Sequence, residues 1–297
     1  MCISNTVEMS FSPSIIATLA TGPAIQDLRI FLASLEIFNV NPPTVYVYCD
    51  TDSADAIAGM TYKGVLHHKV CLDTYAKLSR SDMEGTKGVK FKNLWFDFMT
   101  EKIQLLRWVF SKDPEAKNKG VMFCDADICF FGPLPEIPVG ARVALSPHDI
   151  RPEDERKYGR YNGGYLWISE AQYADIWWNA CADARFYEQS ALEDLAANVK
   201  EHPAWLYEFP VTENYGWWRM WQGSKTAEVL MSEWGMNRSK GGSGITIRGA
   251  RLGSIHTHMH EKKDGATMVF NGFVVGYLRK LADRHIPAKR LMAALKN

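Results

Sequence analysis

Residues 121–133 read VMFCDADICFFGP and place two carboxylates, Asp125 and Asp127, inside one of the most apolar runs of the chain. In extended backbone, residues two apart point to the same side, so both acids are expected to face one point near the end of a buried strand. Two carboxylates about 4 Å apart repel by roughly 4 kcal/mol at an effective dielectric of 20. A divalent cation offsets this repulsion, and oxygen ligands suit Mn²⁺ or Mg²⁺.

Two other arrangements would also account for the acidic pair. A turn in which both acids face water or cap amide groups needs no metal. An Asp-x-Asp after an apolar strand also occurs in phosphatases that form an aspartyl phosphate, but there it usually opens the domain and a small hydroxyl residue follows. Here Ile128 follows, deep in the chain. A metal site is favoured because strand ends in an α/β sheet form a ligand crevice.

The composition is that of an ordinary globular protein. Among 297 residues, Lys+Arg and Asp+Glu number 34 each and hydrophobic residues make up 46%, which permits a sizeable core and gives no support to nucleic acid as a partner. Six cysteines without a CxxC pair favour a reducing compartment. No run approaches the roughly 18 apolar residues of a membrane span, and the N-terminus lacks the basic start of a signal peptide. We therefore expect a cytoplasmic protein.

Apolar periodicity predicts strands and helices that alternate along the chain. Strands are expected at 14–21, 44–50, 121–130, 141–147 and 165–169. Helices are expected at 24–38, 53–60, 94–110 and 267–297, with polar loops at 80–92 and 151–160. This alternation predicts an α/β fold with a parallel sheet. No linker is visible, so one domain over 1–297 is preferred.

The order of these segments resembles that of the GT-A glycosyltransferases, most closely the glycogenin-like nucleotide-sugar transferases. The stretches that carry the resemblance are ATLAT (17–21), MTEKIQLLRW (99–108), VMFCDADICF (121–130), YNGGYLWIS (161–169) and SIHTHMHEKK (254–263). It spans most of 14–265 and implies a GT-A (Rossmann-like) fold with a central, mostly parallel sheet. The donor-binding half would be about 12–135 and the acceptor-side half about 136–297.

The resemblance also implies an activity. A sugar would pass from a nucleoside-diphosphate sugar, with a UDP-sugar as the preferred donor, to a hydroxyl of a carbohydrate or another acceptor, with retention of anomeric configuration. An inverting enzyme would need a base near the acceptor, for which Glu213 and Asp149 are the candidates. Two alternatives remain, a nucleotide-sugar binding protein without catalysis and, less favoured, the phosphatase.

In that family the two motif acids hold a Mn²⁺ or Mg²⁺ that binds the donor diphosphate, and a late histidine completes the site. The acids correspond to Asp125 and Asp127. The family's strand ends in His, and a Lys that contacts the diphosphate follows six residues later, which matches His256 and Lys262. Lys262 would add positive charge as the leaving group develops.

The sequence leaves open which histidine binds the metal. His258 and His260 alternate with His256 on the expected strand, so the metal ligand could be His258 instead. The family's Gly three residues after the histidine and its Pro-Trp after the lysine are missing here. Met259 stands in the place of that Gly.

Further candidates for the donor site follow from the resemblance. They are Thr18, Ala20 and Thr21 beside the nucleoside, Lys102 in preference to Arg107, Ala126 within the motif, and His148, Asn162 and Gly163 near the sugar. Asn162-Gly163-Gly164 resembles the family's Asn-Ala-Gly turn, where small residues let a sugar approach the backbone. Thr18, Ala20 and Thr21 could instead have ordinary packing roles in a strand. Lys102 could instead be an exposed surface charge.

The segment VTENYGWWRMW supplies the last candidates. Glu213 and Asn214 fall where the family places a polar residue on the reacting face of the sugar. Trp217, Trp218 and Trp221 could stack on sugar rings, and core packing is expected for at least one of them.

Overall fold

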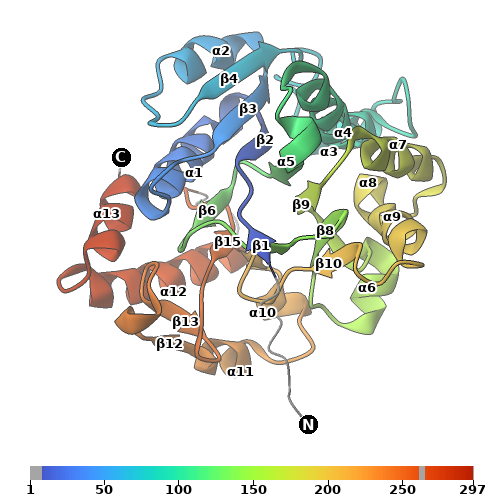
Figure 1. The fold of residues 1–297 in the computed structure, drawn as a ribbon. Helices are drawn as coiled ribbons and strands as arrows, with labels where there is room; N and C mark the ends of the chain where they lie inside the picture. Colours follow the sequence, from blue (N-terminus) through green and yellow to red (C-terminus); the bar gives the residue numbers. More distant parts are fainter. Residues whose placement is uncertain (1–8, 261–264, 297) are drawn as a thin grey trace.

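A seven-stranded sheet forms the centre of the computed structural model, which describes residues 9–260 and 265–296. Its strand order is β10-β8-β9-β5-β2-β3-β4 (Figure 1). The strands are β2 (Ile15–Ala20), β3 (Thr44–Cys49), β4 (Leu66–Val70), β5 (Val121–Cys124), β8 (Val143–Pro147), β9 (Tyr161–Ile168) and β10 (Leu206–Glu208). β9 runs antiparallel to both of its neighbours, and the other six strands share one direction. The predicted α/β class with a mostly parallel central sheet is confirmed.

Helices cover both faces of this sheet (Figure 1). Alternate residues of β2 point to opposite faces, so Ile16 packs with α1 (Ile25–Phe38) and α2 (Thr51–Ala58). Ala17 packs with α4 (Leu94–Lys112), α7 (Ala171–Ala180) and α9 (Leu192–Val199) on the other face. Burial on both faces explains why these strands read as nearly continuous apolar runs.

A second unit of structure packs beside the main sheet. Its three-stranded sheet has the order β11-β15-β6, formed by β11 (Tyr215–Gly216), β15 (Ser254–His256) and β6 (Ile128–Phe130). A small antiparallel sheet consists of β12 (Trp234–Met236), β13 (Ile245–Ile247) and β14 (Ala250–Arg251). α12 (Gly265–Ala282) and α13 (Ile286–Ala294) cover these strands, and α13 also lies beside α1 (Figure 1).

Shorter elements connect these parts. They are β1 (Ser10–Phe11), paired with β7 (Ile137–Pro138), the short 3-10 helices Gly22–Ala24, Cys181–Asp183 and Arg238–Lys240, and α3 (Arg80–Gly85), α5 (Ala116–Lys119), α6 (Pro152–Tyr158), α8 (Tyr187–Ser190), α10 (Arg219–Gln222) and α11 (Ala227–Ser232). Over residues 9–260 and 265–296, no helix is both long enough and apolar enough to cross a membrane.

The strand predicted at 121–130 is in fact two strands in two different sheets. β5 ends at Cys124, residues 125–127 form a turn, and β6 begins at Ile128 in the three-stranded sheet. The expectation that Asp125 and Asp127 share one face of a single extended strand is therefore wrong. Both carboxylates instead extend from this turn between the two sheets toward His256.

Other element boundaries also differ from the prediction. The polar stretches 80–92 and 151–160 contain α3 and α6, because Ser79 caps α3 with a capping box and Pro152 occupies the first turn of α6. β9 begins at Tyr161, so Asn162-Gly163-Gly164 lies inside a strand and not in a turn before it. The expected C-terminal helix is two helices, α12 and α13, and α13 has Pro287 in its first turn.

Gly120 is needed at the entrance to β5. Its φ is +67°, and a Cβ there would contact the Trp167 ring and lie 2.6 Å from the Ile168 carbonyl oxygen. We expect Gly120→Ala to lower the free energy of unfolding by about 2–4 kcal/mol, from left-handed backbone strain and overpacking. Gly276→Ala in α12 meets open space and should raise stability by about 0.5–1 kcal/mol. Urea unfolding of both variants measures this, and equal effects would contradict the prediction.

Candidate functional site

The acidic pair lies where the chain order of the central sheet reverses. From β2 the chain builds outward to β3 and β4, then returns to add β5 on the other side of β2. At such a switch point the loops after neighbouring parallel strands diverge and leave a crevice at their carboxyl ends. Asp125 follows β5 directly, and Thr21 follows β2.

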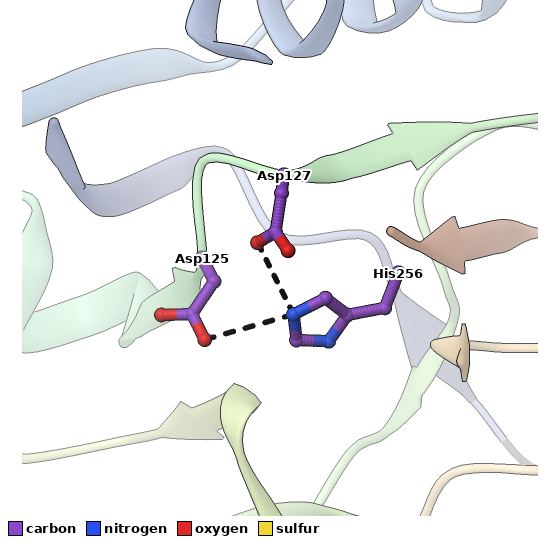
Figure 2. Close-up of side chains that lie close together, drawn as sticks. All are labelled: Asp125, Asp127 and His256. Atoms are coloured by element: carbon purple, nitrogen blue, oxygen red, sulfur yellow. Dashed lines mark ion pairs between the residues drawn. The ribbon is translucent and has the colours of Figure 1, made fainter. Parts of the chain in front are cut away.

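Three side chains converge at this crevice, as Figure 2 shows. His256 Nε2 lies 3.1 Å from Asp127 Oδ1 and 3.7 Å from Asp125 Oδ2. The potential ligand atoms of the three residues all lie within 4.8 Å of one another. Cis ligands of a Mg²⁺-sized ion are about 3 Å apart, given bonds of about 2.1 Å. Two carboxylate oxygens and one imidazole nitrogen also match the ligand preferences of Mn²⁺.

His256 reaches the acids because β15 pairs with β6. His256 lies opposite Ile128, immediately after the acidic turn, and Thr257 N–H donates to the Asp127 carbonyl oxygen at 3.1 Å. On the other side of the ring, His256 Nδ1 lies 2.9 Å from Asn214 Oδ1. A carbonyl oxygen can only accept, so Nδ1 carries a proton. Nε2 is the nitrogen that faces the acids, which is the arrangement of a metal-binding histidine.

Gly164 in β9 allows Asp125 and His256 to approach each other closely. A Cβ at this position would contact the Asp125 carboxylate and lie 2.7 Å from His256 Cε1. Gly164 also accepts a hydrogen bond from Asp125 N–H at 2.8 Å through its carbonyl oxygen. Only glycine leaves room for the acid and the imidazole to share this space.

A buried ion pair lies behind Asp125. Lys102 Nζ is 2.9 Å from Glu188 Oε1 and 3.6 Å from Asp125 Oδ1, and it donates to the Gly163 carbonyl oxygen at 3.1 Å. Lys102 and Glu188 are both almost fully buried. Burial opposes the charge of Lys102, but attraction to Asp125 and Glu188 outweighs it and raises the lysine pKa. Burial raises the pKa of Glu188.

His258 occupies a different position from the one expected on a continuing strand. β15 ends at His256, so His258 lies in the loop beyond it and is more than half exposed. Its Nδ1 is 2.9 Å from Asp27 Oδ2, and its Nε2 is 3.6 Å from Asp127 Oδ2. The hydrogen bond with Asp27 and the attraction of Asp127 raise the pKa of His258 to about 9.

Asp127 lies between the two imidazoles. Burial by itself raises the pKa of Asp127, but the positive charge of a protonated His256 ring, and the hydrogen bond that Nε2 donates in that state, hold this pKa well below its usual range. Asp127 is therefore a carboxylate at neutral pH and attracts cations.

The other candidates on the donor side take varied positions. Thr18 and Ala20 are buried in β2, Ala126 is buried in the acidic turn, and Thr21 is half-buried just beyond β2. The Thr18 hydroxyl has no hydrogen-bond partner among the residues that the structure describes. Lys102, preferred to Arg107, does lie beside Asp125, whereas Arg107 pairs with Asp175 on the surface. Lys262 lies outside the described residues.

His148 and Asn162 are both buried, and their side chains are hydrogen-bonded to each other. His148 Nδ1 donates to the Gly159 carbonyl oxygen at 2.9 Å, and Asn162 Nδ2 is 3.2 Å from His148 Nε2. Burial lowers the pKa of His148 to about 4, so the ring is neutral at pH 7. Gly163 N–H donates to Gln189 Oε1 at 3.2 Å.

Glu213 and Asn214 point to different places despite being adjacent. Asn214 Oδ1 accepts from His256, whereas Glu213 Oε2 accepts from the Tyr165 hydroxyl at 2.9 Å, inside the protein. Trp218 lies edge-on to the His256 ring with centroids 5.0 Å apart. Trp217 and Trp221 pack against each other with centroids 6.2 Å apart, and Trp221 is 41% exposed.

Asp149 lines a pocket to which Asp125, Asp127 and His256 do not contribute. It has a φ of +52° and forms an ion pair with the buried Arg219 at 3.5 Å. The pocket has a volume of about 530 Å³, and Tyr215 and Arg248 also line it.

Sequence reasoning missed Glu188 and Asp27. Each is a carboxylate on a helix whose burial results from packing against distant segments: Glu188 pairs with Lys102, and Asp27 pairs with His258. Local sequence carries no signal for either pairing, because a helical acid with a polar neighbour normally faces water.

Comparisons with known proteins give limited likenesses. No protein-family model matches the chain, and no curated protein matches its sequence. Among solved structures, mouse xyloside xylosyltransferase 1 in its apo form matches with a TM-score of 0.46 and 11% identity, over 82% of this chain and 97% of that one. The glycosyltransferase GlyE of Streptococcus pneumoniae TIGR4 matches with a TM-score of 0.43 and 12% identity, over 69% of this chain and 48% of that one. At these low values neither likeness assigns a family or an activity to this chain.

The ion pair of Lys102 and Glu188 gives a stability prediction. Lys102→Met leaves the buried carboxylate of Glu188 without its partner, so the free energy of unfolding should fall by about 3–5 kcal/mol at pH 7.5. The double variant Lys102→Met/Glu188→Gln should lose clearly less, because the fully buried carboxylate at position 188 is no longer present.

A surface pair serves as the control for this measurement. Lys119 and Glu115 lie 3.0 Å apart, and their side chains are about half exposed, so Lys119→Met should cost at most about 0.5 kcal/mol in the same urea titration. A double variant that is no more stable than Lys102→Met alone would show that the unpaired buried charge is not the cause of the loss.

Glu213 gives a pH prediction. Burial raises its pKa from 4.5 to about 7, so the folded protein holds a proton that the unfolded chain has already released between these pH values. Stability should therefore fall as pH rises through this window, by about 3 kcal/mol in total. Urea unfolding at pH 4 and at pH 8 measures this effect. Between these two pH values, the free energy of unfolding of Glu213→Gln should rise by that amount relative to that of the unmodified protein. A stability difference that does not change with pH would contradict this.

Proposed function

We propose that this protein is a metal-dependent glycosyltransferase that moves a sugar from a nucleoside-diphosphate sugar to an acceptor hydroxyl. One observation carries the proposal: Asp125, Asp127 and His256 converge at the switch point of a mostly parallel sheet. Strand ends at such a point are where α/β proteins bind nucleotides and related ligands. The resemblance of the segment order to glycogenin-like transferases supports the same activity, with UDP-sugar as the first choice of donor and Mn²⁺ or Mg²⁺ as the metal.

The three residues fit a divalent cation by their chemistry. The group combines two carboxylate oxygens with the imidazole nitrogen that faces them, and the Nδ1 hydrogen bond to Asn214 orients that ring. When bound, such a cation supplies positive charge to the diphosphate of the donor. His256 is our choice over His258, because His256 Nε2 faces both acids, whereas His258 Nδ1 pairs with Asp27 and its Nε2 lies 3.6 Å from Asp127.

The other residues have supporting roles in this proposal. Lys102 attracts Asp125 by its charge, and its hydrogen bond to the Gly163 carbonyl oxygen holds the lysine in position. Gly164 keeps the space beside Asp125 free of a side chain. Lys262 would add positive charge near the leaving diphosphate. Retention of configuration rests on the resemblance alone, and the anomeric proton signals of the product would test it.

The activity test uses a panel of UDP-sugars and other nucleotide sugars. With Mn²⁺ present, the protein should release the nucleoside diphosphate from at least one donor, and EDTA should abolish this release. Asp127→Asn should lower kcat/KM by about 10²-fold or more, because the charge that holds the cation is removed. Asp194→Asn, an exposed carboxylate on α9, should leave activity unchanged.

Two different outcomes would replace the proposal. Donor binding without turnover across the whole panel would point to a binding protein that lacks catalysis. Hydrolysis of a phosphomonoester with a trappable acyl phosphate on Asp125 would point to the phosphatase.

A further inference from the structure

Four buried side chains form one continuous hydrogen-bonded chain that ends at the candidate metal ligand. It begins at the Gly159 carbonyl oxygen, 2.9 Å from His148 Nδ1. Asn162 Nδ2 lies 3.2 Å from His148 Nε2, and Asn214 Nδ2 lies 3.1 Å from Asn162 Oδ1. Asn214 Oδ1 then lies 2.9 Å from His256 Nδ1. All four residues are at most 7% exposed, so their hydrogen bonds are largely shielded from water.

The main chain sets the direction of the first bonds. A carbonyl oxygen only accepts, so His148 must donate to Gly159 through Nδ1. Burial keeps the His148 ring neutral at pH 7 by lowering its pKa, which leaves Nε2 as an acceptor for the Asn162 amide nitrogen. Gly164 N–H independently donates to Asn162 Oδ1 at 3.0 Å. Main-chain groups of Gly159 and Gly164 therefore determine which end of the Asn162 amide is oxygen.

The orientation of the Asn162 amide determines the orientation of the Asn214 amide. Asn162 Oδ1 accepts from Asn214 Nδ2, which also lies 3.0 Å from Ser146 Oγ. Asn214 therefore turns its oxygen toward His256, and an amide oxygen can only accept. The ring must place a proton on Nδ1, so the neutral ring leaves Nε2 with a free electron pair toward Asp125 and Asp127.

We propose that Asn162 and Asn214 are positioning residues that keep a proton on Nδ1 of His256, so that Nε2 remains available to bind a divalent cation. The inference rests on the metal site of the proposed function. It gives Asn162 a role two hydrogen bonds away from the metal ligand, in addition to any contact with a sugar.

The backbone of Asn214 supports this assignment. Its φ is +53°, in the left-handed region that non-glycine residues rarely adopt, yet the residue is fully buried. Glycine would relieve the backbone, and asparagine is the side chain that best tolerates this region while supplying an amide. Its backbone N–H donates to Ser254 Oγ at 2.8 Å, which anchors the strained residue to the strand that carries His256.

The first test observes the proton directly. Imidazole ¹⁵N spectra of the metal-free protein are recorded at pH 9 with ¹⁵N-labelled histidine, and His256 is assigned by comparison with His256→Gln. We expect Nδ1 of His256 to be protonated in the unmodified protein. In Asn162→Leu the amide is lost, and Nδ1 should show partial or complete loss of the proton. An unprotonated Nδ1 in the unmodified protein, or a fully protonated Nδ1 in folded Asn162→Leu, would overturn the inference.

The second test measures affinity for Mn²⁺ by electron paramagnetic resonance of the free ion. Asn162→Leu should bind Mn²⁺ about 10- to 100-fold more weakly, as is typical when a residue that orients a metal ligand is lost. Asn162→Asp keeps an acceptor for Gly164 and Asn214, but His148 Nε2 must then take up a proton to donate to the second carboxylate oxygen. Its Mn²⁺ affinity should fall clearly less than that of Asn162→Leu. Unchanged affinity in Asn162→Leu, or equal losses in the two variants, would overturn the inference.

Two further variants separate positioning from general destabilisation. Asn39→Leu removes a half-buried amide that bonds to Leu35 and Leu134, remote in sequence from the chain of hydrogen bonds, and should leave Mn²⁺ affinity unchanged. If Asn162→Leu does not fold, Asn214→Gly removes the amide while relieving the backbone, and the same two measurements apply to it. If the unmodified protein binds no Mn²⁺, the proposed function fails, while the ¹⁵N spectra still decide the position of the proton.

Discussion

The repulsion between Asp125 and Asp127 is the constraint on which the site depends. Both carboxylates leave the end of the central sheet within one turn, and both face the same histidine. The protein supplies partial compensation on two sides, through Lys102 behind Asp125 and His258 beside Asp127. A divalent cation between the acids would complete this compensation, because its charge is larger and closer than that of either side chain.

The residues around the acids are buried polar groups with nearly complete hydrogen bonding. The chain from His148 to His256 has one consistent donor and acceptor order. The Gly164 N–H orients the oxygen of the Asn162 amide, and the His148 ring, which donates to the Gly159 carbonyl oxygen, orients its nitrogen. A buried network of this kind is rigid when fully satisfied, since any rotated amide would leave unpaired groups in a low dielectric. Rigidity of this sort is what a metal site requires of the residues that hold its ligands.

The sequence predicted the fold class and the acidic pair, for identifiable reasons. Strands such as β2 and β3 are buried on both faces, so they appear as apolar runs, and α1 and α4 show a helical stripe. The choice between His256 and His258 was left open because it assumed a strand that continues to His260. β15 instead ends at His256, and pairing with β6 rather than local propensity decides where it stops.

The sequence by itself determined that an α/β sheet carries two acids at a strand end and that a histidine-rich segment follows far along the chain. Only the tertiary structure decided that the acids lie in a turn between two sheets, that His256 is the histidine that meets both, and that Glu188 is buried against Lys102. Periodicity reports which face of an element is apolar, and this is a local property. Which polar groups meet depends on the pairing of strands about 130 residues apart in sequence, and that pairing is set by packing over the whole chain.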